Sequence, residues 1–217
     1  MMFWQMHESA ERRMLQKWLK QCVDVIELGG GVGVLTAHIA KRLSPGKRCI
    51  CVEANPYLIH VIKHNVRINA PTANVEYLQA LISSSQKKYF FLLNFSDLTL
   101  SQIVQTKDNI QDQYGEIIEL QSMNLSSVIE RYELGPYALV MDIEGSELEI
   151  IQNDHESLKN CVQIIAELHR CEQNGVLWNQ EKIAQAIVDL GFELKDRDGY
   201  VFVFERPLIN QAPNQIS

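Results

Sequence analysis

Apolar and polar residues follow two different periods along the chain. Short stretches that are typical of buried strands lie at residues 23–26, 49–52, 74–83, 89–93, 117–120, 137–141 and 162–166. Apolar residues at helical spacing lie at residues 8–21, 35–43, 57–69, 125–132, 146–153 and 180–190. Two last stretches, 192–195 and 200–204, flank Asp198-Gly199, a dipeptide that favours a hairpin. Strands that alternate with helices predict a mostly parallel sheet with helices on both of its faces.

The pattern changes between residues 84 and 116, where most of the second half is polar and has no clear period. We predict that this segment is an insertion that serves as a lid or as an acceptor-binding loop, and a surface loop without such a role is the alternative. Residues 1–217 are expected to form a single domain. Within it, residues 1–22 supply an N-terminal helix and residues 206–217 a frayed tail.

Composition narrows the classes of partner. The formal net charge of −7 argues against a nucleic-acid partner, because phosphate binding needs a basic surface. No apolar run approaches the roughly 18 residues of a membrane span, and we see no signal peptide at the N-terminus. The five cysteines form no CxxC pair, so we expect reduced thiols and a cytoplasmic protein. The oligomeric state stays open.

Glycines cluster after the first predicted strand, in the segment ELGGGVGVLT at residues 27–36. Such a turn lets the backbone approach a ligand closely, although a turn without a ligand is the alternative. A dinucleotide fingerprint needs a third glycine where this chain has Val34, which disfavours an NAD-dependent oxidoreductase. The spacing that is present, E-x-G-x-G-x-G, resembles motif I of the class I S-adenosylmethionine (SAM) methyltransferases. The candidate cofactor residues here are Glu27, Gly29, Gly30, Gly31 and Gly33. An acid at the head of this motif suits a cofactor with a cationic amino-acid end.

Acidic residues follow several predicted strands. Ligands of open α/β sheets bind beyond the carboxyl ends of the strands, and the acids expected there are Glu27, Glu53, Asp142, Glu144 and Glu167. Glu53 lies 20 residues past Gly33, where a carboxylate can accept both hydroxyls of a ribose. Ala80 and Leu81 are expected at the end of the third strand, where an adenine could rest; simple core packing is the alternative. Asn55, followed by proline, is expected to cap the helix at 57–69.

Three segments carry a more specific resemblance. ELGGGVGVLT, the strand end CVEANP and the segment LVMDIEGSELEII at residues 139–151 resemble the FkbM family of SAM-dependent methyltransferases. That family shows D-[VI]-E-G-[AS]-E-x-x-[IVL], followed by a strand that ends in an E-x-H-like sequence, here Glu167-Leu168-His169. The resemblance spans residues 23–169 and, with the closing hairpin, most of the chain. The first motif departs from the usual D-x-G-A-N-x-G, and little sequence precedes the first strand.

The resemblance implies a fold, a cofactor and a substrate class. The fold is a three-layer, Rossmann-like class I methyltransferase with a seven-stranded, mostly parallel sheet, a C-terminal antiparallel hairpin and an insertion between the third and fourth core strands. The cofactor is SAM, with Ala54 and Asn55 beside Glu53 among its contacts. The implied activity is O-methylation of a hydroxyl on a sugar, glycan or secondary metabolite. A SAM-binding module without turnover, or methylation of a protein or another small molecule, remains an alternative.

Methyl transfer to a hydroxyl calls for a general base that removes the hydroxyl proton. We expect His169 in that role, since a neutral imidazole has a pKa of about 6.5, and Asp142 as the second candidate. Glu144 and Glu167 would orient the base or the acceptor. The alternatives are a hydrogen-bonded structural histidine, helix-start carboxylates at Glu144 and Glu147, or Mg²⁺ held by Asp142, Glu144, Glu167 and His169.

Overall fold

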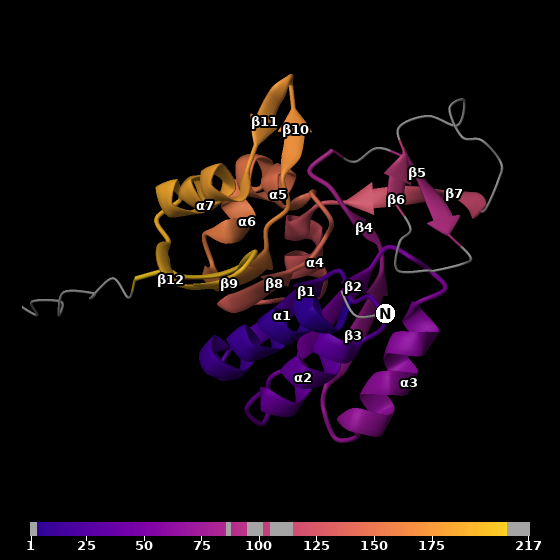
Figure 1. Cartoon of the computed structure of the whole chain (residues 1–217). Coiled ribbons are helices and arrows are strands. Elements are labelled where there is room, and N and C mark those ends of the chain that lie inside the picture. Colours follow the sequence, from indigo (N-terminus) through magenta and orange to yellow (C-terminus); the bar gives the residue numbers. More distant parts are fainter. Residues whose placement is uncertain (1–3, 86–87, 95–101, 105–114, 208–217) are drawn as a thin grey trace, which may run out of the picture.

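A computed structural model describes residues 4–85, 88–94, 102–104 and 115–207 (Figure 1). Its centre is a seven-stranded sheet with the strand order β12-β13-β9-β8-β1-β2-β3. The strands are β1 (Asp24–Leu28), β2 (Cys49–Glu53), β3 (Val75–Gln79), β8 (Tyr137–Met141), β9 (Cys161–Glu167), β12 (Glu193–Asp198) and β13 (Val201–Glu205). β13 pairs antiparallel with both β9 and β12, and all the other pairings in this sheet are parallel. The predicted sheet with its closing hairpin is confirmed.

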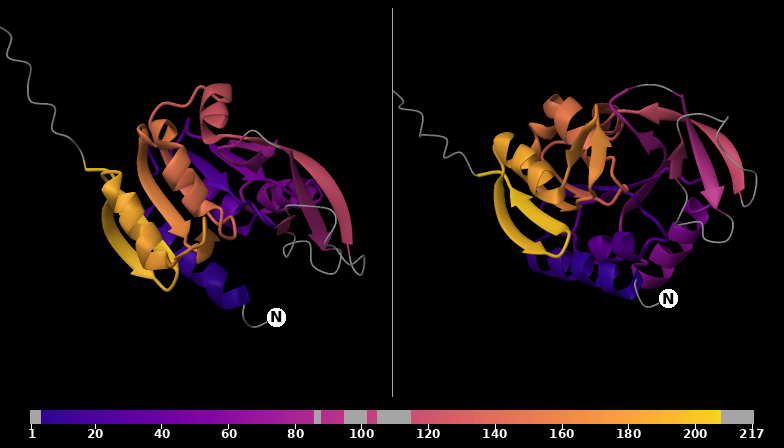
Figure 2. Two further views of the ribbon diagram at one scale, coloured as in Figure 1. Left: turned by 90° about the horizontal axis from the view of Figure 1, so that it is seen from above. Right: turned by 45° about the horizontal axis from the view of Figure 1, so that its top comes forward.

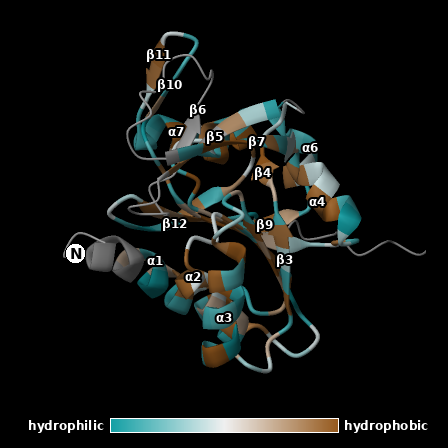
Figure 3. Ribbon diagram, turned by 90° about the vertical axis from the view of Figure 1, so that its right-hand side faces the viewer, coloured by the Kyte–Doolittle hydropathy of each residue, from teal (hydrophilic) through white to brown (hydrophobic). Residues whose placement is uncertain are grey.

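Helices cover both faces of this sheet. One face carries α1 (Trp4–Trp18), α2 (Val34–Arg42) and α3 (Ile59–Asn69); the other carries α4 (Leu125–Arg131), α5 (Glu147–Asn153), α6 (His155–Leu158) and α7 (Gln180–Asp189). Val25 of β1 packs on the side of α1 and α2, whereas Ile26 and Leu28 pack on the side of α4 to α7. A strand buried on both faces needs apolar residues at successive positions, which explains the short apolar runs in the sequence. In Figure 3 the helices carry hydrophobic and hydrophilic residues side by side.

A second, smaller sheet interrupts the chain between β3 and β8. It contains β4 (Leu81–Ile82), β5 (Lys88–Asn94), β6 (Gln102–Val104) and β7 (Gly115–Met123) in the order β4-β7-β5-β6, and it lies to the right in Figure 1. Much of the predicted polar stretch, at 95–101 and 105–114, lies outside the described residues. At the root of the insertion, Glu149 Oε1 of α5 accepts hydrogen bonds from Ser83 Oγ at 2.6 Å and from the Ser84 N–H at 3.0 Å.

Several element boundaries differ from the prediction, and two of them bear on the site. The third strand was expected to reach residue 83, but β3 ends at Gln79, because the chain leaves the central sheet at Ala80 and pairs with β7 instead. The helix expected at 57–69 begins at Ile59, and Leu58 is its N-cap. Asn55 instead shapes the turn before the helix, where its Oδ1 accepts the N–H of Tyr57 at 3.0 Å.

The sequence analysis missed one hairpin and the short helix α6. β10 (Cys171–Gln173) and β11 (Val176–Trp178) turn at Asn174-Gly175, whose φ angles are 53° and 73°. Asn-Gly is the dipeptide that a two-residue turn with two positive φ angles favours, so the signal was present. The hairpin directly follows His169 and projects at the top of Figure 1. In the last hairpin Asp198 pairs with Val201, so the turn residues are Gly199 and Tyr200.

The first helix packs beside the last hairpin, as the right-hand view of Figure 2 shows. Arg13 Nε lies 2.8 Å from Asp198 Oδ2, and Lys17 Nζ lies 2.7 Å from Asp196 Oδ2. The same Asp196 oxygen accepts the indole N–H of Trp18 at 2.8 Å. These contacts hold α1 against the edge of the sheet where β12 and β13 pair. None of the described helices is long and apolar enough to cross a lipid bilayer.

Candidate active site

The glycine turn joins β1 to α2. Gly29 has φ 87°, and a Cβ atom there would lie 1.8 Å from the carbonyl oxygen of Asp142, so the end of β8 leaves room only for glycine. Gly31 has φ 52°, and a Cβ atom there would meet nothing within 4 Å. Cβ atoms at Gly30 and Gly33 would collide with Cys51 and Ile62. The turn is therefore packed against the ends of β8 and β2 and against α3, and it is open at Gly31. A turn that binds a nucleoside cofactor needs such an open position.

Glu53 connects the turn to the end of β2. Its Oε2 accepts the N–H of Gly31 at 2.9 Å, and its Oε1 accepts the N–H of Asn55 at 2.7 Å. The residue is 7% exposed, and this burial raises the pKa of the carboxyl while the backbone N–H groups oppose the rise. Each oxygen keeps a further lone pair, so the carboxylate can also accept ribose hydroxyls. Ala54 is the residue between these two contacts.

The two residues proposed for the adenine lie next to this strand end. The N–H of Ala80 donates to the carbonyl of Glu53 at 3.1 Å. The side chains of Ala80 and Leu81 are 8% and 6% exposed, and they belong to the main core and to the core of the insertion, respectively. Both therefore fill core positions, and contact of either with an adenine stays a prediction.

Glu27 lies inside β1, which continues to Leu28, so the prediction that the strand ends at Glu27 is wrong. The residue is 1% exposed, and neither carboxylate oxygen has a hydrogen-bond partner among the described residues. Burial raises the pKa of Glu27 to about 8, and the neighbouring polar side chains of Thr36 and Cys51 lower it by a smaller amount. At neutral pH this carboxyl is mostly protonated and offers little negative charge to an ammonium group. Its contact with the cofactor stays a prediction.

The acids at the ends of β8 and β9 lie close together. Asp142 follows β8 directly, and its N–H donates to the carbonyl of Leu28 at 3.0 Å. The next residues form a left-handed turn, with φ 53° at Glu144 and 100° at Gly145. His169 Nε2 lies 3.6 Å from Glu144 Oε2 and 3.8 Å from Glu167 Oε1. The structure thus brings together all four residues that the sequence proposed for catalysis.

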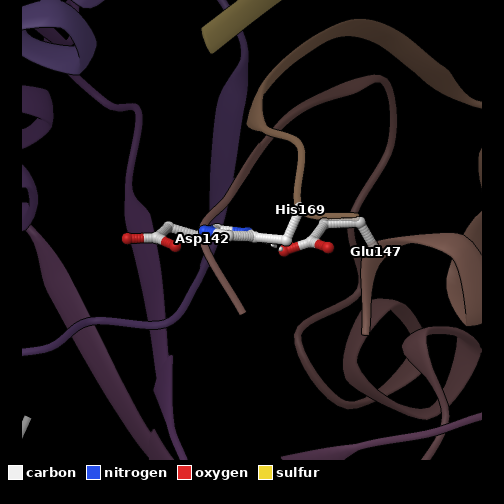
Figure 4. Close-up of side chains that lie close together, drawn as sticks. All are labelled: Asp142, Glu147 and His169. Atoms are coloured by element: carbon white, nitrogen blue, oxygen red, sulfur yellow. Dashed lines mark hydrogen bonds and ion pairs between the residues drawn. The ribbon is translucent and has the colours of Figure 1, made fainter. Parts of the chain in front are cut away.

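The sequence analysis proposed no role in the site for two residues, Glu147, which it noted only as a possible helix-start carboxylate, and Glu11. Glu147 Oε1 lies 3.1 Å from Nδ1 of His169, so the ring stands between Glu147 and Asp142 (Figure 4). Glu11 of α1 is 5% exposed, and one of its carboxylate oxygens lies within 4.8 Å of those of Asp142 and Glu167. Both acids occupy apolar-face positions of a helix. Three and four residues further on lie Met14 and Leu15 in α1, and Ile150 and Ile151 in α5. An acid at such a position is the signal that could have found them.

The acid cluster changes the protonation of its members. Burial, followed by the charge of Glu167, raises the pKa of Asp142 to about 7, and Oδ1 of Asp142 is buried without a partner among the described residues. Burial of the His169 ring lowers its pKa, but the hydrogen bond and charge of Glu147, with the charges of Asp142 and Glu144, raise it to about 9. At neutral pH His169 is therefore a cation. A protonated imidazole has no free lone pair, so it cannot take the proton of an acceptor hydroxyl.

The predicted Mg²⁺ ligands do not form one group. Among the described residues, two sets of three have ligand atoms within 4.8 Å of one another, and neither includes Glu144: Asp142 with Glu147 and His169, and Glu11 with Asp142 and Glu167. In the first set a metal would have to displace the proton of His169, because only a neutral imidazole binds a metal. The second set consists of carboxylates only.

The fold and the glycine turn define a class I SAM-dependent methyltransferase. The family pattern described as the methyltransferase FkbM domain matches residues 27–194. The chain belongs to this FkbM methyltransferase family, as the sequence resemblance predicted, and SAM is its cofactor. No curated protein matches the chain.

Solved structures share the fold at low sequence identity. A putative tRNA (m1A22) methyltransferase of Streptococcus pneumoniae, in complex with S-adenosyl-L-methionine, is 10% identical with a TM-score of 0.50, covering 94% of this chain and 75% of that one. A protein of the NADB-Rossmann superfamily from Streptococcus agalactiae is 9% identical with a TM-score of 0.50, covering 93% and 70%. A precorrin-6y C5,15-methyltransferase from Geobacter metallireducens is 13% identical with a TM-score of 0.49, covering 90% and 87%.

Proposed function

We propose that this chain methylates a hydroxyl group of a sugar, glycan or secondary metabolite, and that Asp142 is the general base. The observation that carries the proposal is the state of Asp142. It follows β8 directly, one of its oxygens is buried without a partner among the described residues, and its pKa lies at about 7. A base whose pKa lies near the working pH is the most effective one.

The cofactor supplies a methyl group on a sulfonium, which is already an activated leaving group. The chain's part in binding it lies in the glycine turn, where Gly31 faces open space, and in Glu53, whose carboxylate is oriented by two backbone N–H groups. A carboxylate fixed in this way accepts ribose hydroxyls without losing side-chain freedom on binding. The remaining task of the chain is to align the acceptor oxygen.

The hydroxyl proton has to leave as the new bond forms, and in this proposal the carboxylate of Asp142 takes it. His169, expected from sequence to be the base, takes a different role here because it is protonated at neutral pH. Its positive charge lowers the pKa of Asp142 and so favours the ionised carboxylate. Glu144 and Glu167 flank His169 at 3.6 and 3.8 Å and orient the ring or the acceptor.

We also propose that residues 84–116 contribute acceptor contacts. The support is the attachment of this insertion to α5, the helix that begins at Glu147. Ser83 Oγ and Ser84 Oγ both donate to Glu149 Oε1, at 2.6 and 2.8 Å. The insertion is therefore joined to α5, the helix that follows Asp142 and the turn at Glu144-Gly145.

The test compares Asp142→Asn with the wild type on a panel of hydroxylated acceptors with labelled SAM. We expect Asp142→Asn to lose about 10²- to 10⁴-fold in methyl transfer, because the variant has no base, while calorimetric SAM affinity is retained. Asp189→Asn on α7 makes the same chemical change at an exposed acid outside the site and serves as the control. Activity within about threefold of wild type in Asp142→Asn would exclude Asp142 as the base.

The same panel separates the alternatives. SAM binding without methyl transfer to any hydroxyl would favour a binding module without turnover. Transfer to a protein or to a small molecule without a hydroxyl would leave the methyltransferase assignment intact and replace the proposed acceptor class.

A further inference from the structure

Glu147, the second acid of the D-[VI]-E-G-[AS]-E pattern, contacts three separate parts of the site although the proposed chemistry gives it no role. Its side chain is 0% exposed. Oε1 lies 3.1 Å from Nδ1 of His169 and accepts the N–H of Ile143 at 3.2 Å, while Oε2 accepts the N–H of Gly145 at 3.1 Å. We propose that Glu147 is a positioning residue, which holds the loop after Asp142 in place and orients the ring of His169 beside that base.

The first half of the proposal concerns the loop. Glu144 has φ 53°, a left-handed conformation that a residue with a side chain adopts at a cost of about 1–2 kcal/mol. The N–H groups of Ile143 and Gly145, on either side of it, both donate to the carboxylate of Glu147. Hydrogen bonds to an ionised acceptor are stronger than neutral ones. The conformation of the loop between Asp142 and α5 is therefore maintained by Glu147.

The second half concerns the ring. With Nδ1 bound to Glu147, Nε2 of His169 faces the acids at the ends of β8 and β9. The charged or titratable groups around the ring are Glu147 on α5, Asp142 and Glu144 in the loop after β8, Glu167 at the end of β9, Glu11 on α1 next to Asp142 and Glu167, and the thiol of Cys171 on β10 next to Glu147. The neighbouring Arg170 is exposed.

Among these acids Glu147 has the strongest hold on the ring. The side chain of Glu144 is 69% exposed, so water screens its charge, and its contact with the ring is 3.6 Å. Glu167 lies 3.8 Å away. Glu147 alone combines complete burial with a hydrogen-bond distance to the ring, and a buried charge is screened far less than an exposed one.

The test is a titration of His169 by NMR on the full chain with isotope-labelled histidine, the signal being assigned from His169→Gln. We expect the wild-type ring to titrate near pH 9 and to carry protons on both nitrogens at pH 7.5. Glu147→Gln keeps the shape of the side chain but removes its charge, so the titration should move down by about one pH unit or more, a tenfold change in proton affinity.

The matched control is Glu149→Gln, the same change two residues further along α5, where the carboxylate binds Ser83 and Ser84 instead. It should leave the His169 titration unchanged. Equal titrations of wild type and Glu147→Gln, or a wild-type ring that titrates near 6.5, would overturn the proposal. Should Glu147→Gln fail to fold, the nitrogen shifts of the wild-type ring at pH 7.5 decide whether both nitrogens carry protons.

The titration needs neither cofactor nor acceptor, so its outcome is independent of the proposed O-methylation on which the catalytic meaning of Glu147 rests. Once an acceptor is known, the pH profile of kcat/KM gives a second readout. If Glu147 acts through His169, Glu147→Gln moves the alkaline limb to lower pH. If Glu147 only supports the fold, the rate falls equally at every pH, and the proposal is wrong.

Discussion

The buried acid of the first strand should make this protein less stable as the pH rises. Glu27 is 1% exposed, lacks a hydrogen-bond partner among the described residues and has a pKa of about 8 instead of the ordinary 4.5. A raised pKa means that the folded state holds a proton which the unfolded chain releases. Glu27→Gln removes this difference while keeping the shape of the side chain, so we expect the variant to be more stable than the wild type at neutral pH.

The magnitude follows from the two pKa values. Below pH 4.5 both states are protonated and Glu27 has no pH-dependent cost. Between pH 4.5 and pH 7 the unfolded chain loses its proton while the folded protein retains it, so each pH unit lowers the free energy of unfolding by about 1.4 kcal/mol. Over 2.5 pH units (7 minus 4.5) the loss is about 3 kcal/mol. The cost grows until about pH 8 and is then constant. The buried amide of the variant would also lack a hydrogen-bond partner, which costs about 1 kcal/mol of stability. We therefore expect Glu27→Gln to be about 2 kcal/mol more stable than the wild type at pH 7.

The assay is urea denaturation and thermal unfolding of wild type and variant, without cofactor, at several pH values between 4.5 and 8.5. About 2 kcal/mol corresponds to a rise in Tm of roughly 4–8 °C for a chain of this length. Glu156→Gln, an exposed acid whose side chain is 83% accessible, is the control and should change stability little at any pH. A stability difference between Glu27→Gln and wild type that is the same at every pH would refute the reasoning.

Three further results are expected. Gly31→Ala should weaken SAM binding by about tenfold or more, because the new Cβ enters the open space over the turn. The control is Gly46→Ala, which also has a positive φ and open surroundings; it should cost about 1–2 kcal/mol of stability and leave the affinity for SAM unchanged. Calorimetry measures the affinity and thermal unfolding measures the stability. Methyl transfer by the wild type should rise with pH through about 7 as Asp142 ionises, and a flat profile would count against that base. EDTA should leave the initial rate unchanged if Asp142 alone removes the proton, and loss of activity that Mg²⁺ restores would revive a metal site.

Most of the central sheet could be predicted from the sequence, because its strands are buried on both faces and therefore read as short apolar runs. β8, all five residues of which are buried, agrees with the prediction residue for residue. The end of β3 could not be found in this way. The apolar residues continue through Leu81 and Ile82, and only pairing with β7, which lies about 40 residues further on, moves them to another sheet. Period alone does not distinguish one sheet from two.

The sequence predicted which residues lie close together in the site, but it did not predict their protonation states. The rule that ligands bind at the carboxyl ends of strands brought Asp142, Glu167 and His169 together correctly. The protonation of His169 depends on Glu147, whose burial and orientation are set by the packing of α5. The apolar-face position of Glu11 indicates that it is buried but not that it lies near Asp142, because its helix reaches Asp142 only through packing against distant parts of the chain.

The contact between α1 and the β12–β13 hairpin has a consequence for protein synthesis. Arg13 and its partner Asp198 are 185 residues apart, so a nascent chain on the ribosome carries α1 for most of its synthesis without these ion pairs. Contacts between such distant segments form late and lengthen the time that apolar surface is exposed. Glu11 lies on the same helix, and its carboxylate can join those of Asp142 and Glu167 only after β8 and β9 have been synthesised.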